Sequence, residues 1–371
     1  MIILYISLFL FACYTILIIY YWQSWISIPE YHSNQKPHST KVSVIIPARN
    51  EEENILALLQ ALQIQTYPED LFEIIVVNDH SDDNTSMIVK QFPRTILIDL
   101  EDDPINSYKK KAIEKGILAA TGTLIITTDA DCIPPIAWIE TIVSFYEEKK
   151  SAFIAAPVVF NIDASLLEIF QALDFLVLQG ITGASVSKKF HSMCNGANLA
   201  YEKEVFEKVN GFDGVDSIAS GDDMLLMHKV SVKFPGKIHY LKSRQAIVAT
   251  QPMKTLKKFF NQRIRWASKA RFYNEKGVFG VLLLVYLFNL SFLALLIAGF
   301  WSPVLWACLL GLWIAKTVVE FPFLYSITTY FNRRSLLKYF LFFQPFHIAY
   351  TILAGWLGQF GKYEWKGRRV H

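Results

Sequence analysis

The sequence is short of charge and has few cysteines. Charged residues make up 19% of its 371 residues and hydrophobic residues 53%. Its mean hydropathy of +0.28 is too apolar for a purely soluble protein. The net charge of +3 is mild and argues against a dedicated nucleic-acid binder. The four cysteines show no pairing pattern and two lie in apolar stretches, which favours a reducing compartment for the middle of the chain.

Two long stretches lack charge altogether. Residues 1–29 have no charged side chain and are long enough to cross a bilayer. They lack the basic start and the cleavage site of a secretory signal, so we expect a retained N-terminal transmembrane anchor. Residues 277–315 are also uncharged, and another apolar run covers 339–361. We therefore expect two to three C-terminal transmembrane helices within 277–361, followed by a basic tail over 362–371.

The middle of the chain, residues 40–250, alternates strand-like with helix-like segments and predicts one α/β domain. Asn50 is expected to cap the first of its helices. Further helices are predicted over 106–119, from 136 and over 164–183. Apolar, β-branched runs predict strands at 42–47, 72–79, 95–100, 123–126 and 152–160.

Polar residues follow the predicted strands at their carboxyl ends. Asp129 and Asp131 come after one strand, Asp79 ends another, and Lys109 follows a third. Carboxyl ends of parallel strands share one rim, where ligands bind. Two acids one residue apart suit a hard divalent cation, and a rim with an added ammonium group suits a nucleoside diphosphate. The alternatives are a solvated turn for the acidic pair and a solvated helix face for Lys109–Lys111.

Three features of the second half carry further chemistry. Asn195 and Gly196 lie in a polar loop, and Asp222 and Asp223 open a predicted helix. Compensation of the helix dipole is the alternative explanation for that acidic pair. Residues 251–276 are basic and amphipathic, which is typical of a helix in the membrane interface, and their Lys and Arg residues favour a cytoplasmic location.

Taken in order, these motifs resemble those of the inverting family 2 glycosyltransferases. The resemblance is to their membrane-embedded branch, which includes cellulose, hyaluronan and poly-N-acetylglucosamine synthases and ceramide-type glucosyltransferases. Asn78, Glu114 and Leu225 depart from the family pattern. The matching segments are Val42–Glu51, Val76–Ser81, Lys109, Asp129–Asp131, Gly221–Asp223 and the Gln-x-x-Arg-Trp motif Gln262–Trp266.

The resemblance implies a GT-A (Rossmann-like) nucleotide-sugar domain and transfer of a sugar, with inversion, from a UDP-sugar to a lipid or saccharide acceptor. It implies that Asp223 is the catalytic base and that Asp129 and Asp131 hold Mg²⁺ or Mn²⁺. Acceptor contacts are expected from Asn195, Gly196, Asp222 and Trp266. Donor contacts are expected from Pro47, Ala48, Asn50, Glu51, Asp79, Lys109, Asp129, Gln262 and Arg265.

A UDP-sugar donor implies a cytoplasmic catalytic domain at the cell (inner) membrane. A full span at 339–360 would then put the basic tail outside, against the positive-inside rule, so we favour a broken or re-entrant segment and a cytosolic tail. One alternative is an inactive membrane scaffold. A transporter would need polar residues within its spans, and the uncharged segments argue against it. The sequence leaves open a polymer synthase or a single-sugar transferase, the sugar and any export partner.

Overall fold

The chain folds into two compact units. A helical unit comprises Met1–Ser27, Ile162–Ile181 and Pro252–Glu364, and a sheet unit comprises Ile28–Asn161, Thr182–Gln251 and Trp365–His371. The computed structural model describes residues 2–33, 38–101, 108–163, 165–190, 193–216, 218, 221–268, 276–360, 363–365 and 368–370.

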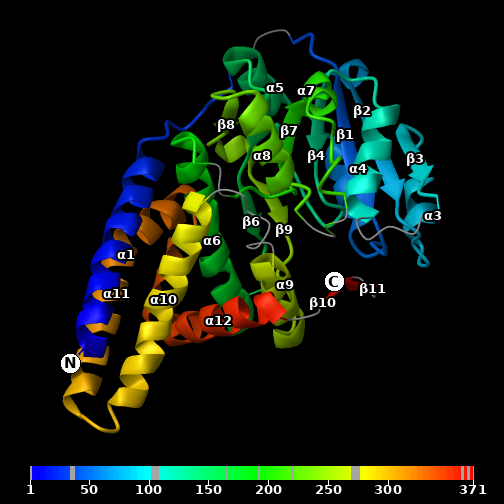
Figure 1. The fold of residues 1–371 in the computed structure, drawn as a ribbon. Helices are drawn as coiled ribbons and strands as arrows, with labels where there is room; N and C mark the ends of the chain where they lie inside the picture. The colour runs from blue at the N-terminus through cyan, green and yellow to red at the C-terminus, as the bar shows by residue number, and fades with distance from the viewer. Residues whose placement is uncertain are drawn as a thin grey trace. The chain divides into compact units, whose positions relative to one another are not determined.

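The sheet unit is built on a seven-stranded sheet with the order β3-β2-β1-β4-β7-β5-β8 (Figure 1). Its first four strands are parallel, β7 runs antiparallel to β4 and β5, and β8 is parallel to β5. The strands are β1 (Val42–Ala48), β2 (Phe72–Asn78), β3 (Thr95–Asp99), β4 (Leu124–Thr127), β5 (Phe153–Ala155), β7 (Leu199–Glu202) and β8 (Ile238–Tyr240).

The central strands are apolar because helices cover them. β4 is buried throughout and β1 almost throughout, as expected for parallel strands covered on both faces. Helix α4 (Tyr108–Ala119) packs very closely on β1, because a Cβ at Gly116 would lie 2.5 Å from Ile45 Cγ2. The helices of this unit are α2 (Ile55–Gln63), α3 (Thr85–Val89), α4 (Tyr108–Ala119), α5 (Trp138–Lys149), α7 (Lys203–Lys208) and α8 (Met224–Lys233).

Two local predictions are wrong. The single strand predicted over 152–160 is two strands, since Pro157 separates β5 from β6 (Val158–Phe160), which pairs with β9 (Val248–Thr250) in a second sheet. Asn50 does not cap α2, which begins only at Ile55 with Asn54 in the cap position. Asn50 instead has a positive φ of 50°, a backbone conformation that asparagine tolerates better than most residues.

The helical unit contains α1 (Ile2–Ile26), α9 (Leu256–Ser268), α10 (Lys276–Ala298), α11 (Val304–Tyr330), α12 (Phe340–Phe360) and the first part of α6 (Leu166–Ser187). Figure 1 shows α1, α10 and α11 side by side, whereas α12 lies across α10. Short strands β10 (Tyr363–Trp365) and β11 (Arg368–Val370) come after α12.

Among the described residues, five helices are long and apolar enough to cross a membrane. They comprise the expected N-terminal and C-terminal segments and, in addition, α6, which the sequence had suggested to be part of the α/β domain. α11 extends beyond the uncharged run and therefore includes Lys316 and Glu320. The argument against a transporter, which rests on uncharged segments, therefore applies only as far as Ala315.

Candidate active site

The carboxyl ends of β1 and β2 form the first part of the site. The two strands are in register, so that Ala48 faces Asn78, and the Asp79 N–H donates to the Ala48 carbonyl at 2.8 Å. The Asp79 carboxylate is buried, 3.0 Å from His80 Nδ1 and 3.7 Å from an Arg49 guanidinium nitrogen. Arg49 was not among the predicted site residues, although it lies inside the first matching segment.

Hydrogen bonds join the loops that follow these two strands. The Asn50 N–H donates to Ser81 Oγ at 3.0 Å, and its side-chain oxygen accepts from the Asp82 N–H at 3.1 Å. The Glu51 N–H donates to Thr85 Oγ1 at 2.8 Å. Pro47, beside Val77 in the strand register, leads into this pair of loops. The predicted nucleoside-binding residues therefore form one continuous rim.

Asn78, a departure from the family pattern, has a structural role. Its side-chain nitrogen donates to Asp99 Oδ1 at 2.8 Å, and its side-chain oxygen accepts from the Ser81 N–H at 3.1 Å. An ionised aspartate could only accept. Asn78 therefore ties the end of β2 to both β3 and the following loop.

Lys109 lies at the centre of the acidic part of the site. Its Nζ is 2.6 Å from Asp129 Oδ1 and 3.1 Å from Asp222 Oδ2. Burial opposes the charge, but the carboxylates outweigh it and hold the pKa of Lys109 well above its ordinary value. The fold thus brings together a lysine and two acids from three distant parts of the chain.

Asp223 lies beside this cluster at the start of α8. Its Oδ1 accepts from the Met224 N–H at 2.7 Å, and its Oδ2 accepts from the Gly196 N–H at 3.3 Å. A Cβ at Gly196 would lie 2.9 Å from Asp222 Oδ2 and 3.3 Å from Lys109 Nζ. The neighbouring Asn195 accepts from the Ala197 N–H at 3.0 Å and so fixes the same loop. Asp223 therefore both caps α8 and lies in the candidate site.

The segment before Asp222 is held by two α4 residues that were not among the predicted site residues. Lys110 is buried, and its Nζ donates to the carbonyls of Val215 and Ile218, at 2.6 Å in each case. Glu114, the second departure from the family pattern, accepts from the Phe212 N–H at 3.2 Å. Helix α4 thus offers Lys109 to the acids and uses Lys110 and Glu114 to fix the chain leading to them.

The predicted metal pair follows β4. Asp131 Oδ1 lies 3.8 Å from the buried Cys132 Sγ. Burial and the Asp131 carboxylate raise the pKa of this thiol well above its ordinary value, which leaves it neutral. None of the four cysteines forms a disulfide.

Two carboxylates fit a divalent ion here only when a ligand completes the coordination. Among the residues that the structure describes, no group of three His, Cys, Asp or Glu side chains is placed to hold a metal. Mg²⁺ is typically bound by one or two carboxylates together with substrate phosphates. Asp129 and Asp131 fit that arrangement.

The Gln-x-x-Arg-Trp residues lie on α9 in the helical unit. Arg263, between the named motif positions, is 4% exposed and lies 2.7 Å from Asp174 Oδ2. Its guanidinium lies 4.2 Å from the centre of the Trp266 ring. The same group donates a hydrogen bond to Gln262 Oε1 at 3.4 Å. Gln262, Arg265 and Trp266 are each half-buried. Lys269 and Arg271, in the predicted amphipathic segment, are outside the described residues.

One face of α6 anchors α9. Glu168, Gln171 and Asp174 are spaced by three residues and so share that face. Glu168 is 3.0 Å from Lys254 Nζ, Gln171 exchanges two hydrogen bonds of 2.8 and 3.0 Å with the Met253 backbone, and Asp174 pairs with Arg263. The start and the middle of the α9 segment are therefore both fixed.

Comparisons with known proteins address both the fold and the class of protein. Residues 43–209 match the family described as Glycosyl transferase family 2. The mannosyltransferase PcManGT from Pyrobaculum calidifontis, whose structure is in complex with GDP-Man and Mn²⁺, has a TM-score of 0.58 and 17% identity and covers 96% of this chain and 99% of its own. The expected GT-A fold is confirmed.

Sequence relatives extend over more of the chain. A probable glycosyltransferase of Bacillus subtilis, YdaM, is 26% identical over 368 residues, or 88% of this chain and 84% of the relative. The poly-β-1,6-N-acetyl-D-glucosamine synthase of Staphylococcus epidermidis is 25% identical over 231 residues, or 61% of this chain and 53% of the relative. The family match and these relatives support a glycosyltransferase.

Proposed function

We propose that this chain is a membrane-bound, inverting family 2 glycosyltransferase that transfers a sugar from a UDP-sugar to a lipid or saccharide acceptor. The observation that carries this proposal is the cluster in which Lys109 bridges Asp129 and Asp222 while Gly196 and Asp223 lie against it. Cation, carboxylates and a candidate base on one rim are what a nucleotide-sugar reaction requires.

Donor binding follows from the rim. Asp79 and the loop of Pro47, Ala48, Asn50 and Glu51 would contact the nucleoside. Asp129 and Asp131 would hold Mg²⁺ or Mn²⁺, which neutralises charge on a leaving diphosphate. Lys109 supplies positive charge beside them. On α9, Gln262 and Arg265 would contact the diphosphate, since a guanidinium fork matches phosphate oxygens.

The transfer step assigns the proton to Asp223. The acceptor hydroxyl would attack the anomeric carbon in line, the bond from that carbon to the UDP oxygen would break with its electron pair leaving on UDP, and Asp223 would take the hydroxyl proton. Attack opposite the leaving group inverts the configuration. The Gly196 N–H orients Asp223 Oδ2, and Asn195, Asp222 and Trp266 would line the acceptor site.

We also propose a location and a topology. The enzyme would lie in the cell membrane with its sheet unit in the cytoplasm, where UDP-sugars are made. With α1, α10 and α11 as spans, Arg333 and Arg334 are cytoplasmic. The position of α12 across α10 supports a segment that does not cross again, and the basic tail then stays inside, as the positive-inside rule prefers.

The inactive-scaffold alternative loses two of its arguments. Asn78 ties β2 to β3, and Glu114 fixes the segment before Asp222. These departures therefore have structural reasons that do not require loss of activity. A polymer synthase and a single-sugar transferase remain the two forms of the proposal that an experiment must separate.

The test uses purified, detergent-solubilised protein with Mg²⁺ or Mn²⁺ and a panel of UDP-sugars, with GDP-mannose as the competing donor. Nucleotide release is measured with and without membrane lipid extract. One glycolipid product would indicate a single-sugar transferase, and a ladder or insoluble product a polymer synthase. No release from any donor, with UDP still bound, would favour the scaffold.

The control variant is Asp223→Asn. Loss of a general base should reduce transfer by about 10²- to 10⁴-fold, while UDP binding measured by calorimetry stays nearly unchanged. An equal loss of binding and transfer would contradict the role of Asp223.

A further inference from the structure

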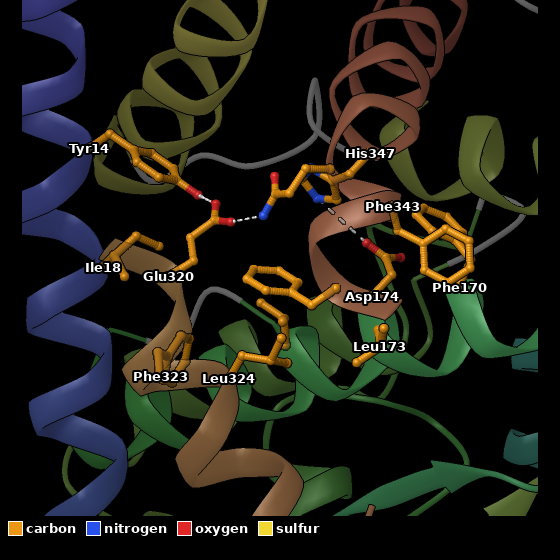
Figure 2. A pocket seen from close by; sticks show the side chains of 13 residues that line it. Tyr14, Ile18, Phe170, Leu173, Asp174, Glu320, Phe323, Leu324, Phe343 and His347 are labelled. Atoms are coloured by element: carbon orange, nitrogen blue, oxygen red, sulfur yellow. Dashed lines mark hydrogen bonds and ion pairs between the residues drawn. The ribbon is translucent and has the colours of Figure 1, made fainter. Parts of the chain in front are cut away.

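The helical unit contains a pocket of about 80 Å³ that is lined by none of the predicted site residues (Figure 2). Its walls come from α1, α6, α11 and α12. Most of the lining is apolar and includes Ile18, Leu173, Phe323 and Phe343. A mainly apolar lining with a few convergent polar groups is typical of small-ligand sites, but this volume is below their usual range of about 300–1,000 Å³ and admits only part of a larger molecule.

One polar group of the pocket centres on Glu320. Its carboxylate accepts a hydrogen bond from the Tyr14 hydroxyl, as Figure 2 shows, and another from Gln344 Nε2. Lys316, which is fully buried, lies 2.6 Å from Glu320 Oε1 and donates to Gln344 Oε1 at 2.6 Å. This carboxylate therefore has its own cation.

A second polar group centres on Asp174. His347 Nε2 is 3.7 Å from Asp174 Oδ1, which also accepts from the Tyr350 hydroxyl at 2.6 Å. Asp174 pairs in addition with Arg263. His347 Nδ1 is buried and has no hydrogen-bond partner among the described residues. One polar atom at the pocket is thus left for a ligand.

The charges restrict the ligand's chemistry. Each carboxylate is matched by one engaged cation, so a phosphate would meet two negative groups and would have to break a buried ion pair, which is costly. A hydroxyl group can donate to a carboxylate or amide oxygen and accept from a ring N–H such as that of His347. The polar end of the pocket therefore suits an uncharged, hydroxyl-bearing group.

The apolar part and its setting identify the kind of molecule. All four helices are as long and apolar as membrane-crossing helices, and two of them, α1 and α11, are proposed spans. Lys316 and Glu320 lie on α11, and ionisable groups within a span are costly and usually mark functional sites. We propose that this pocket binds the head of a lipid, a head that is uncharged and carries a free hydroxyl group, as in a diacylglycerol or a long-chain alcohol.

The lipid has a place in the chemistry of the chain. A free hydroxyl is the nucleophile that an acceptor must offer, so such a lipid would be a sugar acceptor. This last step rests on the proposed function, whereas the binding itself does not. Asp174 lines the pocket and also anchors Arg263 on α9, so an occupied pocket would contact the same carboxylate that holds the Gln-x-x-Arg-Trp helix.

The experiment measures capture of lipid in the absence of any sugar donor. The full chain is placed in phosphatidylcholine nanodiscs with a trace of diacylglycerol that carries a photoactivatable diazirine in one acyl chain. After illumination, labelled peptides are identified by mass spectrometry. We expect label in the peptides of α6 and α12 that line the pocket, and competition by excess unlabelled diacylglycerol.

Two variants fill the pocket, and one is a matched control. Leu173→Trp, or Val177→Phe should the first fold poorly, is expected to reduce capture at least about tenfold, a loss of about 1.4 kcal/mol of binding free energy. Leu296→Trp changes an exposed position on α10 and should leave capture unchanged.

Three results would overturn the proposal: no capture, capture that neither pocket variant reduces, or equal labelling of the same peptides by photoactivatable phosphatidylglycerol or polyprenyl phosphate. The Asp223→Asn protein should still capture diacylglycerol. A protein that captures lipid but transfers no sugar would overturn the proposed function and leave the lipid site standing.

Discussion

Lys109 in the sheet unit and Arg263 in the helical unit are both cations placed against aspartates, yet their surroundings differ. The Lys109 side chain is 21% exposed and is shared between Asp129 and Asp222. The Arg263 side chain is 4% exposed, with one aspartate and two aromatic rings around it. The first cation has an open side for a ligand and the second is enclosed. We infer that Lys109 belongs to a binding site and that Arg263 is an anchor.

The largest expected effect comes from breaking the enclosed pair. Asp174→Asn leaves a buried guanidinium without its counter-charge, which typically costs about 3–5 kcal/mol, and thermal unfolding should report it. The double variant Asp174→Asn/Arg263→Gln removes both charges and should recover most of the loss. Asp163→Asn is the matched control, because that carboxylate is exposed and pairs with Lys254. Equal destabilisation by the single and double variants would show that the pair itself is not the cause.

Lys109→Met tests the open cation. Losing a charged hydrogen-bond donor to the diphosphate should cost about 1.5–3 kcal/mol, or roughly ten- to a hundredfold in kcat/KM for the donor. Stability should change less than in Asp174→Asn, since Asp129 and Asp222 are partly exposed. Lys115→Met, on the same helix and paired with an exposed Glu101, is the control. A Lys109 variant that melts like Asp174→Asn while keeping full activity would reverse the assignment of site and anchor.

The same contrast explains what the sequence could predict. The contact of Lys109 with Asp129 was predictable because apolar strands mark their own carboxyl ends, and a parallel sheet gathers those ends on one rim. The Asp174–Arg263 pair was not, because Asp174 lies in a helix with no strand pattern to fix its partners. Arg263 was already accounted for as one of the basic residues of the predicted amphipathic helix over 251–276.

Local sequence also misled where tertiary contacts decide the structure. The strand predicted over 152–160 has the right residues, but Pro157 lacks an N–H and the chain divides between two sheets there. The Asn50 side chain could cap a helix, but Asn50 instead forms hydrogen bonds with Ser81 and Asp82 in a neighbouring loop. Lys316 and Glu320 lie just past an uncharged run. Their spacing of four residues allows a pair on one helix face, but their contacts with Tyr14 and Gln344 depend on the assembled helices.

Gly196→Ala makes a smaller change at the open site. The added methyl would lie 2.9 Å from Asp222 Oδ2 and 3.3 Å from Lys109 Nζ, so those flexible ends must shift by a few tenths of an ångström. We expect kcat to fall about tenfold, as for about 1.4 kcal/mol of lost transition-state stabilisation, with UDP affinity nearly unchanged. Gly280→Ala, where nothing lies near the new Cβ, is the control. A loss confined to UDP affinity would move Gly196 from the acceptor side to the donor side.

The smallest expected effect concerns Lys242, a buried lysine of the sheet unit. Burial lowers the pKa of Lys242 from 10.5 to about 8, with Glu30 opposing the shift, and its Nζ donates to the Ile28 carbonyl at 2.9 Å. Between these two pKa values the unfolded chain binds more protons than the folded one, so the contribution of Lys242 to stability rises with pH.

Lys242→Met should therefore lose stability relative to the unchanged protein as pH increases from 8 to 10. Denaturant unfolding of both proteins across that range measures the difference and cancels the tyrosines, such as Tyr31, whose raised pKa acts in the opposite direction above pH 10. Lys41→Met, at an exposed position of the same unit, should show a constant difference. If the Lys242 difference is constant too, its ammonium is not desolvated as its burial indicates. Partial burial would then be too little to lower the pKa of a lysine. Only full burial, as at Arg263, would distinguish a structural cation from one in a binding site.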